Sequence, residues 1–174
     1  MKISDAINLI RDAEIDHSNP SIWADLGCGS GTFTLALAHL LAEGSTVYAI
    51  DKQSQRISKP DHEVNIVFRQ ADFERDALNL SPLDGLLMAN ALHYMEDKEA
   101  LLSRLLQYIR PGGKLLLVEY DTLRANPWVP YPIDFQHMES LLQLLGMERV
   151  VKLGERRSLY NGSQMYACLA EKGK

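Results

Sequence analysis

Near its start the chain reads Asp25-Leu26-Gly27-Cys28-Gly29-Ser30-Gly31-Thr32, a glycine-rich turn between two apolar segments. The residues before it, 21–26, are typical of a buried strand, and residues 32–42 after it are typical of an apolar helix. Glycines two positions apart let the backbone turn sharply and approach a ligand with no side chain in between. The free N–H groups at the start of the helix then face that ligand. We therefore expect a strand–turn–helix unit that binds a small molecule.

Two common nucleotide-binding patterns do not fit this turn. A dinucleotide fingerprint needs glycines at its first, third and sixth positions, and Thr32 stands at the sixth position from Gly27. A phosphate-binding P-loop needs Gly-Lys-Ser/Thr, and the turn contains no lysine. What the turn does contain is Asp25, two positions before Gly27, followed by a Gly-x-Gly-x-Gly run.

Outward from the turn, segments typical of strands alternate with segments typical of helices. We expect strands at residues 21–26, 46–50, 64–68, 83–89, 114–119, 147–153 and 164–170, and helices at 3–15, 32–42, 53–58, about 101–109 and 135–145. Apolar strands that alternate with helices indicate a parallel sheet covered on both faces. The last two strands have no helix between them and should form an antiparallel hairpin. The predicted fold is therefore α/β: a doubly wound, mostly parallel seven-stranded sheet with a C-terminal antiparallel hairpin and helices on both faces.

Length and composition agree with one globular domain over residues 1–174. The chain is 46% hydrophobic and 24% charged, and it is long enough to bury a core. Its net charge of −5 argues against a nucleic-acid partner. Two cysteines, Cys28 and Cys168, cannot form a disulfide framework and favour a cytoplasmic location. We find no apolar run of the roughly 18–20 residues that span a bilayer and no signal-peptide pattern.

Further motifs follow the other expected strands. Asp51 ends the second, Gln70-Ala71-Asp72-Phe73 follows the third, Ala89-Asn90-Ala91-Leu92-His93-Tyr94 follows the fourth, and Ile109-Arg110-Pro111-Gly112-Gly113-Lys114-Leu115 leads into the fifth. With the glycine turn, these motifs resemble those of the class I S-adenosylmethionine-dependent methyltransferases, in the same order over roughly residues 21–120. The segment after the fourth strand is similar to the small-molecule branch, which includes the ubiquinone-type enzymes.

The resemblance implies S-adenosyl-L-methionine as the cofactor and assigns a role to each strand end. Asp51 would bind both ribose hydroxyls, and Asp72 and the Phe73 N–H would contact the adenine. The glycine turn suits the carboxylate of the methionine part, and the carbonyls of Gly27 and Asn90 suit its ammonium. The expected cofactor-binding residues are Asp25, Gly27, Cys28, Gly29, Gly31, Asp51, Lys52, Asp72, Phe73 and Asn90. Taken one at a time, aspartates and glycines at strand ends are more often structural turn residues than ligand contacts. A cysteine such as Cys28 is more often a small buried side chain than a reactive thiol. We expect no metal site, because no Cys or His pair has ligand spacing.

The methyl acceptor leaves weaker signals. His93 is a candidate general base and Tyr94 a hydrogen-bonding or aromatic neighbour, and the alternative is that His93 only packs beside the cofactor. Trp128, Tyr131 and Arg157 are candidate acceptor contacts. Arg156-Arg157, with Tyr160 nearby in the final hairpin, could bind an acidic acceptor, and the alternative is that the two arginines are part of a solvated turn.

The chain offers two segments that can cover the cleft. Within the single domain we separate an N-terminal helix (1–17), a cofactor-binding core (21–120), a lid loop (121–133), and the last helix with the terminal hairpin (134–174). The helix and the loop should lie over the carboxyl edge of the sheet and enclose a small acceptor. Alternatively the helix covers a sheet face and the loop is a connector.

The sequence thus predicts a methyltransferase that moves a methyl group to a small organic acceptor by in-line displacement. A compact chain with an open cleft is also compatible with a methyltransferase for protein or RNA. The third alternative is a non-catalytic protein that binds S-adenosylmethionine. The sequence identifies neither the acceptor nor the oligomeric state.

Overall fold

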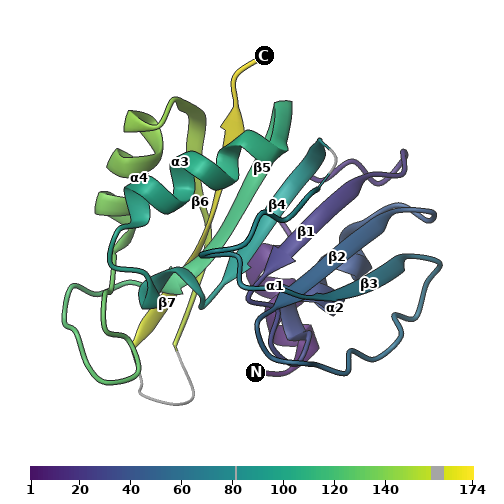
Figure 1. Ribbon diagram of the computed structural model, residues 1–174, viewed down its shortest axis with the longest axis horizontal. Coiled ribbons are helices and arrows are strands. Elements are labelled where there is room, and N and C mark those ends of the chain that lie inside the picture. Colours follow the sequence, from purple (N-terminus) through teal and green to yellow (C-terminus); the bar gives the residue numbers. More distant parts are fainter. Residues whose placement is uncertain (81, 158–162) are drawn as a thin grey trace.

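The computed structural model describes residues 1–80, 82–157 and 163–174. Seven strands form one sheet in the order β3-β2-β1-β4-β5-β7-β6 (Figure 1). The strands are β1 Ile22–Leu26, β2 Thr46–Asp51, β3 Asn65–Gln70, β4 Leu83–Ala89, β5 Ile109–Tyr120, β6 Met147–Arg157 and β7 Gln164–Lys172. The helices are α1 Ile3–Ile10, α2 Thr32–Leu40, α3 Lys98–Leu105 and α4 Phe135–Leu144, with 3₁₀ turns η1 Leu92–Tyr94 and η2 Leu106–Tyr108.

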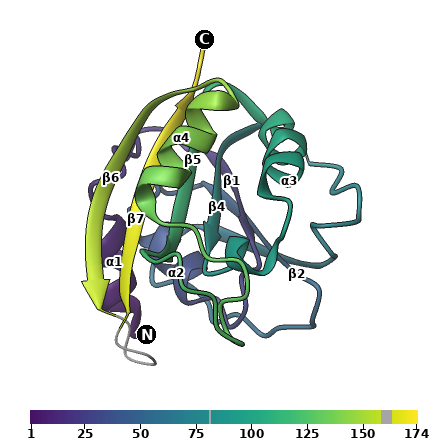
Figure 2. The same ribbon diagram turned by 90° about the vertical axis from the view of Figure 1, so that its left-hand side faces the viewer.

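The strand order reverses between β1 and β4. From β1 the chain builds β2 and β3 on one side, then crosses back to place β4 on the other side, and all these pairs are parallel. Strand β5 continues the parallel sheet, whereas β7 runs antiparallel between β5 and β6 at the edge seen in Figure 2. The predicted seven-stranded fold with its antiparallel hairpin is confirmed. Ligands of such sheets bind beyond the carboxyl ends of the strands beside this reversal.

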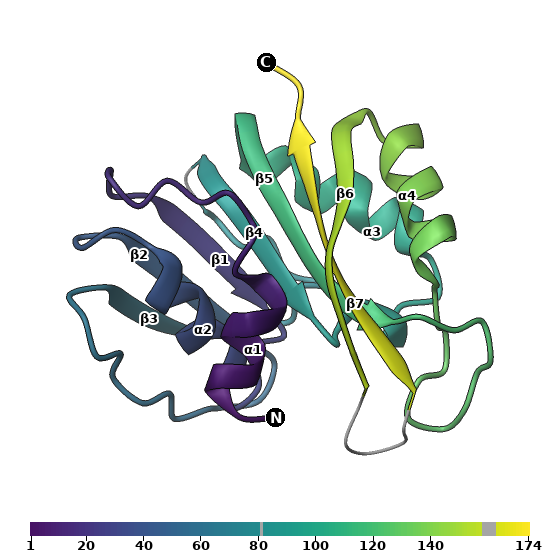
Figure 3. The ribbon, with the colours of Figure 1, turned by 180° about the vertical axis from the view of Figure 1, so that it is seen from behind.

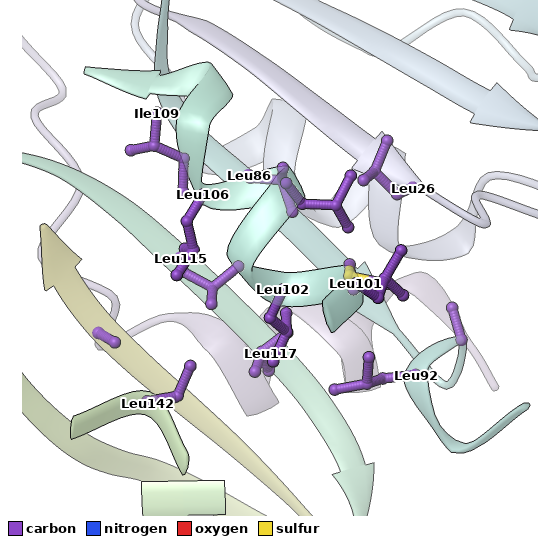
Figure 4. Close-up of a cluster of buried hydrophobic side chains, with 14 of the residues drawn as sticks. Leu26, Leu86, Leu92, Leu101, Leu102, Leu106, Ile109, Leu115, Leu117 and Leu142 are labelled. Atoms are coloured by element: carbon purple, nitrogen blue, oxygen red, sulfur yellow. The ribbon is translucent and has the colours of Figure 1, made fainter. Parts of the chain in front are cut away.

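Helices cover the two faces of the sheet in pairs. Helices α3 and α4 lie on the face shown in Figure 1, and α1 and α2 on the opposite face, seen in Figure 3. The first pair closes a core of leucines from β4, β5 and α3 (Figure 4). The second core joins Leu9 and Ile10 of α1 to Phe33 and Leu37 of α2 over Trp23. Because one core lies on each side, the apolar strands are buried on both faces.

Four predicted elements need correction. Residues 53–58 form no helix, and their stretch between β2 and β3 is irregular. The six residues contain one strongly apolar side chain, Ile57, so a helix there would have no face to bury. The predicted N-terminal helix ends at Ile10 rather than residue 15, and the helix expected to reach residue 109 ends at Leu105. Strand β5 starts at Ile109 rather than at residue 114, and its register against β4 is shifted between Leu83 and Gly85.

Candidate functional site

The glycine turn is attached to the end of the neighbouring strand β2. The N–H groups of Gly27 and Cys28 both donate to the Ile50 carbonyl, at 2.8 and 3.1 Å. The Gly29 N–H donates to Oδ2 of Asp51 at 2.9 Å. Gly29 has a φ of +49°, and a Cβ built on it would meet no atom within 4 Å. The backbone of Gly29 therefore faces open space, where a ligand can approach it directly.

Two cavities adjoin this turn, and they share Gly27, Gly29 and Asn90. The first, which we call cavity A, has a volume of about 260 Å³. It is lined by Met1, Asp25, Gly27, Cys28, Gly29, Ser30, Thr32, Phe33, Ala89, Asn90, Tyr120, Arg156 and Met165. The second, cavity B, has a volume of about 380 Å³. It is lined by Gly27, Gly29, Asp51, Lys52, Gln53, Gln55, Asp72, Phe73, Glu74, Asn90, Ala91, Tyr94 and Met95. A ligand that passes over the glycine turn can occupy both.

Cavity A contains two buried oxygen atoms that lack hydrogen-bond partners within the described part of the chain. Asp25 is 1% exposed, and its Oδ2 accepts a 2.6 Å hydrogen bond from Thr34 Oγ1, whereas its Oδ1 has no partner. Oδ1 of Asn90 has none either. Burial raises the pKa of Asp25 to about 7, and the nearby charge of Asp51 adds to the shift. Buried polar atoms in folded proteins are nearly always paired, so these two oxygens point to a ligand with donor groups.

Cavity B presents the carboxylates of Asp51 and Asp72. Oδ1 of Asp51 accepts from the Gln53 N–H at 2.8 Å, and Oδ1 of Asp72 accepts from the Glu74 N–H at 3.0 Å. These bonds hold both side chains at the ends of β2 and β3. Carboxylate oxygens have further lone pairs, so each can still accept a hydrogen bond from a ligand.

His93 and Glu119 form a buried pair beneath the site. His93 Nδ1 lies 2.7 Å from Glu119 Oε2, and the side chains are 3% and 1% exposed. The other carboxylate oxygen, Oε1, accepts from the N–H groups of Leu92 and His93. The pair therefore holds η1 against the end of β5. His93 lines neither cavity, whereas Tyr94 beside it lines cavity B.

The structure brings most of the expected cofactor-binding residues together. All of them line cavity A or B except Gly31. Gly31 has a φ of +84°, and a Cβ there would lie 2.6 Å from Ile57, so a glycine is required for packing. Cys28 lines cavity A, but burial raises the pKa of its thiol to about 12. It is therefore a neutral filler at neutral pH rather than a nucleophile.

The expected acceptor contacts are placed differently. Trp128, Tyr131 and Arg157 line neither cavity, and Trp128 is 77% exposed. The loop 121–133 instead packs on η1, where the Tyr131 N–H donates to the His93 carbonyl. Tyr160 lies outside the described residues.

The N-terminal helix takes the simpler of its two expected places. Its residues Ala6, Leu9 and Ile10 are buried in the core, so α1 covers a sheet face (Figure 3). Met1, ahead of the helix, reaches cavity A, whereas no residue of α1 lines it.

Sequence reasoning did not predict Met165 as part of the wall of cavity A, nor that Arg156 rather than Arg157 lines it. Tyr120 of β5, Met165 of β7 and Arg156 of β6 are consecutive partners across three strands. They become neighbours only through the antiparallel pairing. The sequence pattern predicted the hairpin. It did not predict the strand register that places Arg156, rather than Arg157, on the wall of cavity A.

A family model described as "Methyltransferase domain" matches residues 21–170. A trans-aconitate 2-methyltransferase of Deinococcus radiodurans is 36% identical over 94 residues, which cover 52% of this chain and 34% of that protein. The O-methyltransferase cnsE of Penicillium expansum is 29% identical over 120 residues, which cover 66% of this chain and 43% of that protein. The chain thus spans less than half the length of these relatives.

Among solved structures, human N-acetylserotonin methyltransferase in complex with S-adenosylmethionine has the same fold. Its TM-score is 0.69 at 24% identity, and the match covers 98% of this chain and 52% of that one. Over residues 1–80, 82–157 and 163–174, no group of three or more His, Cys, Asp or Glu side chains is arranged to hold a metal ion. In the same residues, no helix has the length and apolarity to cross a membrane.

Proposed function

Because the chain belongs to the methyltransferase domain family of class I, S-adenosylmethionine-dependent enzymes, we propose that it transfers a methyl group from S-adenosylmethionine to a small organic acceptor. The observation that carries the proposal is the pair of unpartnered buried oxygens, Asp25 Oδ1 and Asn90 Oδ1, beside a glycine turn that joins two cavities. The two free, buried cysteines support a cytoplasmic location for the protein.

The residues around the turn fit the parts of this cofactor. In cavity B, Asp51 offers its carboxylate to the ribose hydroxyls, and Asp72 with Phe73 lines the place of the adenine. In cavity A, Asp25 and Asn90 offer oxygens to an ammonium group. The start of α2, where Thr32 and Phe33 line cavity A, offers N–H groups to a carboxylate. Lys52 lines cavity B, where its aliphatic stem can cover one face of the adenine.

When bound, S-adenosylmethionine supplies an electrophilic methyl group on a sulfonium. The chain's contribution is to hold the acceptor at the distance and angle of an in-line displacement, which is chiefly a matter of positioning. Tyr120 and Met165 also line cavity A, and they suit that task because they present an aromatic ring and a thioether from strands other than those that carry the glycine turn. A cavity of this size accepts a small molecule more readily than a polymer segment.

We assign His93 a positioning role rather than that of a base. Its Nδ1 and its backbone N–H both bind Glu119, so the pair fixes the segment that carries Asn90 and Tyr94. The Asn90 N–H in turn donates to the Val118 carbonyl at 2.8 Å. A general base is needed only for an acceptor whose proton leaves early. Tyr94 contributes a wall of cavity B.

Calorimetry with S-adenosylhomocysteine tests the binding half of the proposal. Asp51→Ala removes a carboxylate that faces cavity B and also the bond to the Gly29 N–H. We expect it to weaken binding by about 1–3 kcal/mol, the usual contribution of a hydrogen bond to a charged group. Asp12→Ala, an exposed carboxylate that lines neither cavity, is the matched control. Unchanged affinity in Asp51→Ala would remove this residue from the site, and tighter binding of NAD would refute the assignment of the cofactor.

Methyl transfer is tested with methyl-labelled cofactor offered together with a low-mass metabolite extract, RNA or protein. Label in low-mass products supports a small acceptor. Label only in protein or RNA would favour a macromolecular acceptor. Binding without any transfer would indicate a non-catalytic protein that binds this cofactor.

A further inference from the structure

Arg156 contributes a cationic side chain to the wall of cavity A. It lies near the end of β6, and among the described residues that line the cavity it has the only cationic side chain. Its side chain is 25% exposed, and Nη1 lies 2.7 Å from Oδ1 of Asp5 in α1. Asp5 itself does not line the cavity. Arg156 is therefore part of the wall of the space where a ligand would lie, and its guanidinium pairs with the carboxylate of Asp5.

The wall that carries Arg156 is separate from the wall that suits the cofactor. Tyr120, Met165 and Arg156 are register partners on β5, β7 and β6, so their side chains share one face of the sheet. The glycine turn, Asp25 and Asn90 belong instead to the ends of β1 and β4. Across the three strands, the wall that carries Arg156 has an aromatic ring, then a thioether, then a guanidinium. Such a wall matches a molecule with an apolar body and an anionic end.

Asp5 shows what kind of group the guanidinium takes. Oδ1 of Asp5 already forms an ion pair with one guanidinium nitrogen of Arg156. Both side chains are about one quarter exposed, and ion pairs with that much water contact contribute little to stability. An incoming carboxylate can therefore replace Asp5, or share the guanidinium with it, at small cost.

We propose that Arg156 binds a carboxylate group of the methyl acceptor, so that the acceptor is a small organic acid with an apolar body against Tyr120 and Met165. This inference rests on the proposed methyltransferase function and specifies its substrate class. Arg156 is then a specificity-determining residue, and Asp5 is the competing internal anion.

Opposite effects of two variants distinguish this role from a structural ion pair. Arg156→Met and Asp5→Asn both remove the same ion pair, so a purely structural pair predicts the same loss from both. The proposal predicts that Arg156→Met raises the apparent KM for the acceptor by about tenfold or more, because a charge-assisted bond is lost. It predicts that Asp5→Asn lowers the apparent KM, because the guanidinium is freed. Arg156→Lys keeps the charge without the planar fork and should give an intermediate value.

Arg149→Met is the matched control. Arg149 lies on the same strand and also pairs with an acid of the N-terminal segment, Glu14. It lines neither cavity A nor cavity B, so its removal should leave the acceptor preference unchanged.

The assay uses methyl-labelled S-adenosylmethionine and a low-mass metabolite extract, separated beforehand by ion exchange into anionic, neutral and cationic acceptors. We expect label in the anionic fraction, and dilution series of that fraction give the apparent KM of each variant. Calorimetry should find the same affinity for S-adenosylhomocysteine in every variant, and thermal melting checks that each one folds. If Arg156→Met does not fold, Arg156→Lys and Asp5→Asn carry the comparison.

Several results would overturn the inference. Label confined to the neutral or cationic fraction would refute an acidic acceptor and leave the proposed function intact. Parallel losses in the Arg156 and Asp5 variants would make the pair structural. Weaker binding of S-adenosylhomocysteine to Arg156→Met would assign the guanidinium to the cofactor's own carboxylate. Label in no low-mass fraction would refute the proposed function itself, and this inference with it.

Discussion

Asp25 should make cofactor binding depend on pH. Its carboxyl group is buried, its Oδ1 is unpartnered, and burial raises its pKa from 3.8 to about 7. A ligand ammonium beside Oδ1 requires the ionised form. Below pH 7 the free protein therefore has to release a proton from Asp25 when the ligand binds.

The size of the effect follows from this pKa. An ionisation that must accompany binding weakens the affinity by about tenfold for each pH unit below the pKa, so binding at pH 6 should be about tenfold weaker than its plateau. The ligand-free protein shows the opposite sign. Between pH 3.8 and about 7 the folded chain holds a proton on Asp25 that the unfolded chain has lost. The contribution of Asp25 to the free energy of unfolding therefore falls as pH rises through this range and is constant above it.

Calorimetric titration of S-adenosylhomocysteine between about pH 5.5 and 7.5, where the ligand keeps its ammonium charge, measures the effect. Asp25→Asn cannot ionise, so its affinity should be lower and nearly independent of pH. Thr34→Val removes the hydrogen bond that lowers the pKa of Asp25, and it should move the wild-type curve to higher pH. An Asp25→Asn variant that keeps the wild-type slope would refute the reasoning, because another group would then release the proton.

Three further substitutions separate the site from the fold. Gly29→Val should abolish binding of S-adenosylhomocysteine in calorimetry while circular dichroism still shows a folded chain, because the new side chain enters open space. Gly85→Ala should instead lower the melting temperature, because its Cβ would lie 2.3 Å from the Trp23 ring. If Gly29→Val unfolds, the main role of Gly29 is structural. Glu119→Ala leaves three buried donors of Leu92 and His93 without an acceptor. We expect it to lower the free energy of unfolding, measured by urea denaturation, by about 1–3 kcal/mol or more. A loss below about 1 kcal/mol would contradict the role given to the buried pair.

Local signals in the sequence were enough to predict the fold class and most of the residues that gather around the glycine turn. Parallel strands that are buried on both faces have continuous apolar sequences, and tight turns contain glycines. Both signals are local in the sequence and can be recognised without knowledge of distant contacts. Every parallel strand ends at the same edge of the sheet, so residues that follow successive strands must meet there. The positions of Asp25, Asp51, Asp72 and Asn90 along the chain were therefore sufficient to group them.

The wall of cavity A that comes from β5, β6 and β7 and the absence of a helix at residues 53–58 depend instead on tertiary packing. Residues 53–58 are polar enough for a surface helix, but a helix there would also need an apolar face to pack against the protein. Their one large apolar side chain, Ile57, packs against Gly31 instead. Trp128 and Tyr131 are aromatic residues in a loop after a strand, yet that loop packs on η1 and leaves the cavity to Met165 and Arg156. Which of two adjacent arginines faces the cavity depends on the register of β6 against β7. In a strand, a shift of one residue turns each side chain to the opposite face, and that register is set by pairing between distant segments.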